Sequence, residues 1–208
     1  MAPRAAGKQA FVAGQVAVLE MEGCNPSYLA FASAPEDEEY EFLIKRSDQA
    51  SNLAHSLFKA EAPSEITLSN IVGNGFAVEK YQAHDLIFVA MGTGIAPLRS
   101  TLRHVFCARE NYGKLVVLHG ARTKDGFYFA DEIQNEWRNH DVTLRQVISR
   151  PDEEWGGTTG YVQSLLDNII PDLHEPVALI CGSPEMMQHT QERLRELDFT
   201  DDRILMNY

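Results

Sequence analysis

The most constraining feature of this 208-residue sequence is an apolar run that leads through a glycine turn into a helical pattern, over residues 86–105. Its first six residues are apolar without a break, which predicts a strand buried on both faces of a sheet. Leu98, Leu102 and Val105 then recur at helical spacing. Pro97 stands where the first helical residue is expected, a position in which proline fits a helix.

The turn between the strand and the helix reads Gly92-Thr93-Gly94-Ile95-Ala96-Pro97. Glycines let the backbone approach a ligand closely, and the N–H groups and dipole at a helix N-terminus attract an anion. The pattern is G-x-G-x-x-P rather than the usual G-x-G-x-x-G of dinucleotide sites. A phosphate site and a plain structural turn are therefore the two readings of this motif alone. The candidate phosphate-binding residues are Gly92, Thr93, Gly94, Ile95 and Pro97.

Composition disfavours several classes of partner. The formal net charge of −12 argues against binding a nucleic-acid backbone or an anionic membrane. No apolar run approaches the ~20 residues that a membrane span needs. Cys24, Cys107 and Cys181 form no C-x-x-C pair, so we expect no metal site on cysteines. The same cysteine usage predicts a soluble protein of a reducing compartment, the cytoplasm or a plastid stroma.

The first part of the chain, residues 1–83, has a β-rich pattern. Its expected elements are strands beginning near residue 15 and at 28–33, 40–46 and 65–69, with a short helix at 51–58. The acidic run at residues 36–39 is predicted to be a solvated hairpin turn. We therefore expect a small antiparallel β-barrel here.

The second part, residues 84–208, alternates apolar strands with helical patterns, which predicts a doubly wound parallel sheet. The expected strands are 86–91, 115–118, 142–148, 177–181 and 204–206, and the expected helices are 97–109, 130–139, 161–169 and 184–197. Ligands of such sheets lie outside the carboxyl ends of the strands. The sequence thus predicts an α/β nucleotide-binding domain at 84–208 that follows the barrel-like domain at 1–83.

Four motifs in this second part resemble the ferredoxin–NADP reductase superfamily, in a plant-type reductase-like branch. They are Gly92-Thr93-Gly94-Ile95-Ala96-Pro97-Leu98, Gly120-Ala121-Arg122-Thr123, Gly160-Tyr161-Val162 and Cys181-Gly182-Ser183-Pro184. The resemblance implies that the first turn holds the pyrophosphate of NAD(P)H and that Arg122 meets the adenosine ribose or its phosphate. It also implies that Gly182 and Met186 line the cofactor pocket and that Cys181 lies at the site of hydride transfer. On the residues alone, the alternative for Arg122 is a solvated arginine at a strand end, and the alternative for Cys181 and Met186 is a core position.

The resemblance implies a flavin-binding barrel in residues 1–83. The family signature is Arg-x-Tyr-Ser, but the matching segment here is Ser27-Tyr28-Leu29-Ala30, in which all three functional side chains are replaced. The first barrel strands look missing, so we expect a truncated barrel, or one that a partner or an extension completes.

Four other residues carry the flavin resemblance. Ser51 and Asn52 match the helix start that holds the flavin pyrophosphate, although Asp48 stands where the family has glycine. Ser33 is a further candidate cofactor contact. Tyr208 matches the C-terminal aromatic residue that stacks on the flavin ring; its alternative is an ordinary exposed terminal residue.

Two hypotheses of function follow. The first is a flavin-dependent NAD(P)H oxidoreductase that passes hydride to FAD and electrons onward to a separate protein, a small molecule or a larger complex. The second is a flavin-free NAD(P)-binding subunit, or a docking or sensing module, derived from a reductase. A dehydrogenase without flavin is disfavoured, because we find no His/Asp or Tyr/Lys constellation; His119 is expected to be a packed core residue. The choice between NADH and NADPH stays open.

Overall fold

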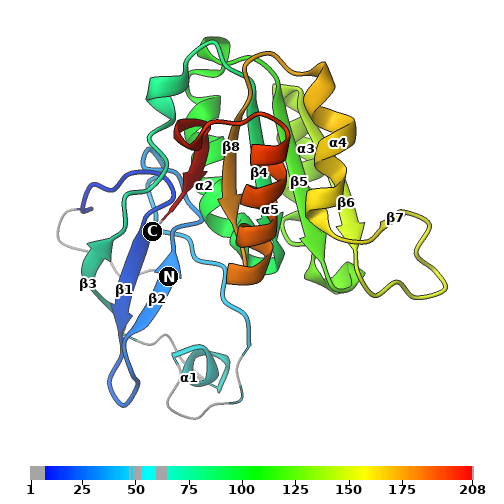
Figure 1. Cartoon of the computed structure of the whole chain (residues 1–208). Helices are drawn as coiled ribbons and strands as arrows, with labels where there is room; N and C mark the ends of the chain where they lie inside the picture. Colours follow the sequence, from blue (N-terminus) through cyan, green and yellow to red (C-terminus); the bar gives the residue numbers. More distant parts are fainter. Residues whose placement is uncertain (1–7, 47, 49–52, 60–64, 208) are drawn as a thin grey trace.

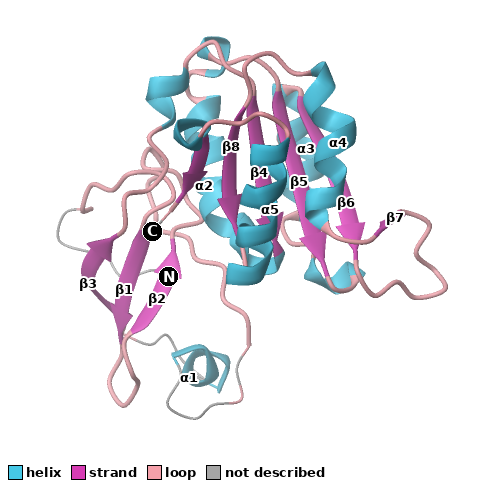
Figure 2. Cartoon of the chain, in the orientation of Figure 1, coloured by secondary structure: helices cyan, strands magenta, loops and turns pink. Residues whose placement is uncertain are grey.

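The computed structural model describes residues 8–46, 48, 53–59 and 65–207. Two sheets form the molecule (Figures 1 and 2). One is a three-stranded antiparallel sheet of order β2-β1-β3, and the other is a six-stranded parallel sheet of order β7-β6-β5-β4-β8-β9. The predicted α/β fold preceded by a small antiparallel sheet is confirmed.

The antiparallel sheet is small and is centred on β1. Its strands are β1 (Val16–Glu20), β2 (Ser27–Ala30) and β3 (Thr67–Val72), and α1 (Leu53–Lys59) lies beside it (Figure 1). The predicted strand at 40–46 is wrong. Only one bridge forms there, between Phe31 and Phe42, because the chain then leaves the sheet edge and Leu43 and Lys45 line a cleft instead.

The parallel sheet contains β4 (Leu86–Met91), β5 (Leu115–Ala121), β6 (Val142–Ile148), β7 (Thr158–Thr159), β8 (Val177–Cys181) and β9 (Ile204–Met206). The helices α2 (Ile95–Phe106) and α3 (Ala130–Asn135) pack on one face, and α4 (Leu166–Ile169) and α5 (Pro184–Glu196) pack on the other. Strand β4 pairs with both β5 and β8 and is covered on both faces, which explains its unbroken apolar sequence. No helix in the described part of the chain is long and apolar enough to cross a membrane.

Two expected helices are shorter than predicted. The helix expected at 161–169 is a 3₁₀ turn over Val162–Leu165 followed by the four residues of α4. The helix expected at 130–139 divides into α3 and a 3₁₀ turn over Trp137–His140, in which the Trp137 side chain is buried. In both cases the apolar residues still pack against the sheet, as Leu166 and Ile133 do.

A row of cationic side chains on α2 joins the two sheets. Arg99, which is almost fully buried, donates to the Ala32 carbonyl oxygen at 2.7 Å and to the carboxylates of Glu41 and Glu132. One turn later, Arg103 pairs with Asp37 at 2.9 Å. Buried guanidinium groups need such partners, because an unpaired charge away from water is costly.

The acidic run at 36–39 is therefore not simply a solvated turn. Asp37 accepts hydrogen bonds from Arg103 and from the Ala34 N–H, and Glu36 pairs with His104 at 2.8 Å. Burial by itself raises the pKa of Asp37, but the hydrogen bonds from Arg103 and Ala34 outweigh it, so this pKa lies below its usual value. The run docks the antiparallel sheet onto α2.

Asp37→Asn tests this docking contact. We expect the variant to lose about 1–2 kcal/mol of unfolding free energy at pH 7, because it removes a charged acceptor from a partly buried pair. Since the folded-state pKa is depressed, the stabilisation is present above pH ~4 and is lost as the pH falls through the folded-state value. Urea unfolding at several pH values measures both effects.

Glu38→Gln is the matched control for Asp37→Asn. Glu38 lies in the same turn, is exposed, and has no hydrogen-bond or ion-pair partner in the described part of the chain. Its loss should change stability by less than about 0.5 kcal/mol. Equal effects of the two substitutions would contradict a docking role for Asp37.

Candidate nucleotide-binding site

The glycine turn after β4 forms a short 3₁₀ turn, Gly92–Gly94, that runs directly into α2. Gly92 has a φ of +54°, a left-handed conformation that favours glycine. Gly94 is required for a different reason: a Cβ atom there would overlap the carbonyl oxygen of Cys181 at the end of β8. The two glycines therefore bring the ends of two neighbouring strands into backbone contact.

The N-terminus of α2 faces open space. No side chain among the described residues caps it, and the Thr93 side chain beside it is exposed, whereas Ile95 and Pro97 are buried beneath the turn. The backbone at the turn and the positive end of the helix dipole are thus available to an anion. Of the predicted phosphate-binding residues, Gly92, Thr93, Gly94 and Pro97 line the same cleft.

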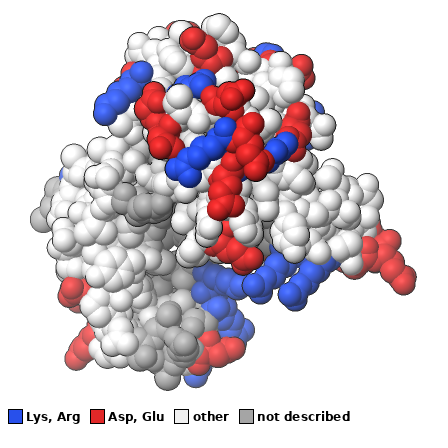
Figure 3. Space-filling view, in the orientation of Figure 1, with Lys and Arg blue, Asp and Glu red and all other residues white. Residues whose placement is uncertain are grey.

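This cleft, of about 930 Å³, lies between the two sheets at the carboxyl ends of the parallel strands. Its walls come from the glycine turn, from the ends of β5 and β8, and from β2 and the segment after Phe42. The residues that matter for its chemistry are Leu29, Leu43, Lys45, Thr93, Arg122, Tyr128, Arg150, Cys181 and Gly182. Figure 3 shows Lys and Arg side chains gathered beside this opening, although the chain as a whole is acidic.

Three cations line the cleft without protein partners. The side chains of Lys45, Arg122 and Arg150 are exposed and make no hydrogen bond or ion pair within residues 8–46, 48, 53–59 and 65–207. Lys124, by contrast, is held by Glu154 at 2.7 Å and by Asp152 at 3.5 Å. The three unpaired cations are therefore the ones available to phosphate groups.

Arg150 was not identified as a candidate site residue from the sequence. It lies just after β6, and its N–H donates to the Arg122 carbonyl oxygen at 2.8 Å. The available signal was its position at a strand end, where ligands of parallel sheets bind. Only the pairing of β5 with β6 shows that the two arginines stand side by side.

Cys181 ends β8 and lines the cleft beside the glycine turn. Burial raises the pKa of its thiol to about 12, and no cation offsets this effect. At neutral pH the group is therefore a protonated, polarisable thiol, and it is suited to packing against a ligand rather than to attacking one.

A second cavity, of about 520 Å³, continues from the cleft over the ends of β5 and β6. It shares Arg122 and Arg150 with the cleft and adds Tyr161, whose ring is 67% exposed, and Met186. Gly182 packs so closely against Met186 that a Cβ atom on it would overlap the end of the Met186 side chain. Met186 itself is only 6% exposed, so it belongs both to the core and to the cavity wall.

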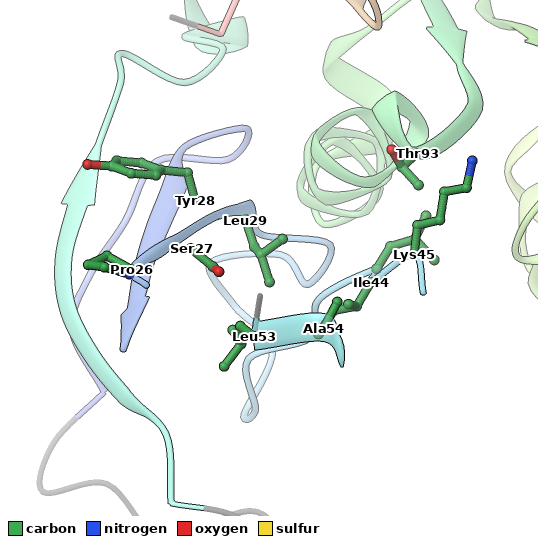
Figure 4. A pocket seen from close by; sticks show the side chains of 10 residues that line it. Pro26, Ser27, Tyr28, Leu29, Ile44, Lys45, Leu53, Ala54 and Thr93 are labelled. Carbon is green, nitrogen blue, oxygen red and sulfur yellow. The ribbon is translucent and has the colours of Figure 1, made fainter. Parts of the chain in front are cut away.

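A third cavity, of about 390 Å³, opens on the other side of the cleft (Figure 4). Leu29 points toward Leu53 and Ala54 on α1, while Lys45 extends beside Thr93. Tyr28 extends from the other side of β2, away from Thr93, and is 67% exposed. The wall thus combines apolar side chains with polar ones and one cation.

The remaining predicted residues lie elsewhere. Ser33 is fully buried, and its hydroxyl oxygen accepts a hydrogen bond from the Glu41 N–H at 3.1 Å, so it lines none of the three cavities. Ser33 therefore supports the loop that docks on α2. Ser51, Asn52 and Tyr208 lie outside the described residues.

Sequence similarity to known families identifies the family of the chain. The family model described as the oxidoreductase NAD-binding domain matches residues 88–192, about half of the chain. The chain belongs to this family. The resemblance to the ferredoxin–NADP reductase superfamily is confirmed with it, and the matched range contains the glycine turn, Arg122, Arg150 and Cys181.

Relatives of this NAD-binding family cover nearly the whole chain. Sulfhydrogenase 1 subunit gamma of Pyrococcus furiosus is 25% identical over 98% of the chain and 70% of its own length. The glycine betaine monooxygenase reductase subunit of Chromohalobacter salexigens is 29% identical over 91% of the chain, but the match spans only 53% of that protein.

Solved structures share the fold of this chain. A ferredoxin–NADP⁺ reductase from Neisseria gonorrhoeae, with bound FAD and NADP, superposes with a TM-score of 0.78 at 22% identity. The match covers 95% of this chain and 87% of that one. A cytochrome P450 reductase from Amycolatopsis matches with a TM-score of 0.82 at 19% identity, over 97% and 62% of the two chains.

Alanine substitutions at the two glycines of the turn should have unequal effects. Gly94→Ala places a Cβ against backbone that cannot move independently, so we expect a loss of about 1–3 kcal/mol of stability. Gly92→Ala meets no atom within 4 Å and should cost about 1 kcal/mol, through its positive φ alone. Gly156→Ala, with neither constraint, is the control. Denaturant unfolding of the three variants checks this order, and a reversed order would disprove the close contact.

The Cys181 thiol should resist alkylation in the folded protein. With a pKa of about 12, its thiolate fraction at pH 8 is about a thousandfold below that of a free cysteine. We expect iodoacetamide to label Cys181 quickly only after unfolding, as measured by mass spectrometry of the peptides. Rapid labelling of the native protein at pH 8 would show that this thiol is ionised or exposed.

Proposed function

We propose that this chain is a flavin-dependent NAD(P)H oxidoreductase, which takes hydride from NAD(P)H and passes electrons through FAD to a separate acceptor. The observation that carries the proposal is the continuity of three cavities past the glycine turn. Arg122 and Arg150 line both the second cavity and the cleft, and Lys45 and Thr93 line both the cleft and the third cavity. A nucleotide on one side therefore meets a ligand on the other at the carboxyl ends of β4 and β8.

The residues present suit a dinucleotide in the second cavity and the cleft. The exposed ring of Tyr161 offers a face for adenine, and Arg122 and Arg150 offer planar forks for phosphate or ribose oxygens. The turn at 92–95 supplies backbone N–H groups for the pyrophosphate. This arrangement brings the nicotinamide to Cys181, whose neutral thiol excludes water from the reacting ring.

The third cavity suits a flavin in the apolar part of its wall and its single cation. Leu29, Leu43 and Leu53 present apolar surface for a ring system, and Lys45 supplies a positive charge for a phosphate where the family's signature arginine is missing. FAD, when bound, supplies the hydride-accepting ring and the storage of two electrons. The chain contributes binding, orientation of the two rings and exclusion of water.

A second candidate is a flavin-free NAD(P)-binding subunit. It is favoured by the sequence of β2, Ser27-Tyr28-Leu29-Ala30. In this strand Ser27, Leu29 and Ala30 stand where the flavin signature has arginine, tyrosine and serine. Two of the similar proteins are themselves named as subunits, of a sulfhydrogenase and of a monooxygenase. Both candidates are compatible with a further protein chain as acceptor or partner, which the relatives' names support.

The absorbance spectrum of the purified protein, before and after added FAD and anaerobic NADH or NADPH, separates the two candidates. The first predicts a flavin band that bleaches on reduction. Dinucleotide binding by calorimetry without any flavin band, even after FAD is added, would select the second. Failure to bind either dinucleotide would exclude both.

Arg122→Ala and Arg150→Ala should each raise the dissociation constant for NAD(P)H about tenfold, because each removes a charge-assisted contact worth about 1.5 kcal/mol. Comparing the effects on NADH and NADPH decides the coenzyme preference. Arg138→Ala, an exposed arginine on the 3₁₀ turn before β6, is the control and should leave binding unchanged. If the two cleft variants bind as tightly as Arg138→Ala, the phosphates lie elsewhere.

A further inference from the structure

His119 is a fully buried side chain beneath the glycine turn, in a place where a core residue would normally be apolar. It lies on β5, where its Cα partners are Ala90 on β4 and Gln146 on β6. The Phe127 ring packs against it edge-on, with the ring centroids 5.1 Å apart. Its side chain reaches the start of the turn, where Nε2 lies 3.2 Å from the carbonyl oxygen of Gly92.

The hydrogen bonding of His119 is one-sided. Its other ring nitrogen, Nδ1, is buried and has no partner in the described part of the chain. Burial lowers the pKa of His119 to about 4, with the Gly92 carbonyl opposing the shift, so the ring is neutral at physiological pH. Since only Nε2 faces an acceptor, the single ring proton resides on Nε2 and is donated to Gly92.

That hydrogen bond orients the peptide group between Gly92 and Thr93. In a trans peptide the carbonyl and the following N–H point in opposite directions. The Gly92 carbonyl also accepts from the Ile95 N–H, so two donors hold it toward the protein interior. The Thr93 N–H is therefore turned the other way, toward the cleft that the exposed Thr93 residue lines.

We propose that His119 is a positioning residue, which fixes the Gly92–Thr93 peptide so that the Thr93 N–H points at the pyrophosphate of the bound dinucleotide. The inference rests on the proposed function, because the pyrophosphate is the ligand that this function assigns to the turn. It explains why a polar ring with one unsatisfied nitrogen occupies the interior: Gly92 is conformationally free, and without the ring only the Ile95 N–H would hold its carbonyl.

Three substitutions of His119 test whether its hydrogen bond to Gly92 positions the peptide. In His119→Gln the side-chain amide can still donate to Gly92, whereas in His119→Asn it is too short and in His119→Leu it is absent. Ser100→Ala is the matched control, since the Ser100 hydroxyl is also buried and without a partner in the described structure but lies on α2, away from the Gly92 carbonyl. Thermal unfolding reports which variants remain folded.

Three measurements test the role. Titration with ADP-ribose, followed by calorimetry, should show about tenfold weaker binding for His119→Leu and His119→Asn, and no more than threefold for His119→Gln. Titration with inorganic pyrophosphate, followed by amide NMR, should shift the Thr93 signal in the wild type and in His119→Gln, and shift it much less in His119→Asn. In turnover assays of His119→Leu and His119→Asn, the KM for the dinucleotide should rise, while kcat changes less than twofold.

Some outcomes would overturn the proposal. If folded His119→Asn and His119→Gln bind ADP-ribose equally well and show the same Thr93 shift, His119 does not position the peptide. If His119→Leu does not fold, the Asn and Gln pair still decides the matter. A wild-type protein that binds neither ADP-ribose nor pyrophosphate would instead refute the proposed function, and Ser100→Ala weakened as much as His119→Leu would show a general packing effect.

Discussion

The site depends on one backbone contact, between the glycine turn after β4 and the carbonyl at the end of β8. Gly94 lies so close to Cys181 that no side chain fits between them. The contact exists because β4 pairs in parallel with β8, so the two strands end at the same edge of the sheet. It brings the N-terminus of α2 beside a neutral thiol, and it leaves an open cleft above both.

Helix α2 has a second structural role along its length. Its first turn faces the cleft, while its later turns carry Arg99 and Arg103, which bind the acidic loop of the antiparallel sheet. The same helix therefore forms the floor of the cleft and sets the position of the opposite wall. A change in the docking contacts would alter the width of the cleft without touching any residue that lines it.

Charge is distributed unevenly over the molecule. The chain carries twelve more acidic than basic side chains, yet Lys45, Arg122 and Arg150 meet at the cleft without acidic partners in the described structure. Elsewhere the described cations are often paired, as Lys124 is with Glu154. The three cations outnumber the one described acidic side chain that lines the cleft, Asp125, so the cleft favours an anionic ligand more than the rest of the surface does.

The sequence by itself determined most of the elements of the parallel sheet and the position of the glycine turn. Residues 86–91, 142–148 and 177–181 had patterns strong enough to give their strand bounds, and the two glycines located the ligand edge. Such features are local, because strand burial and positive φ impose their own residue types on a short segment. The predicted strand at 40–46 failed because, of these described residues, only Tyr40 and Phe42 pack against the antiparallel sheet, whereas Leu43 and Ile44 line cavities.

Only the tertiary structure decided which side chains meet. The structure places Arg150 beside Arg122, docks the acidic run on α2, buries Ser33 away from the cavities and brings the His119 ring to the Gly92 carbonyl oxygen. Most of these contacts join residues that are far apart in the chain, and their energies depend on burial and on partners that no local pattern records. The role of a polar residue follows from the groups that surround it, and those groups are brought together only when the chain folds.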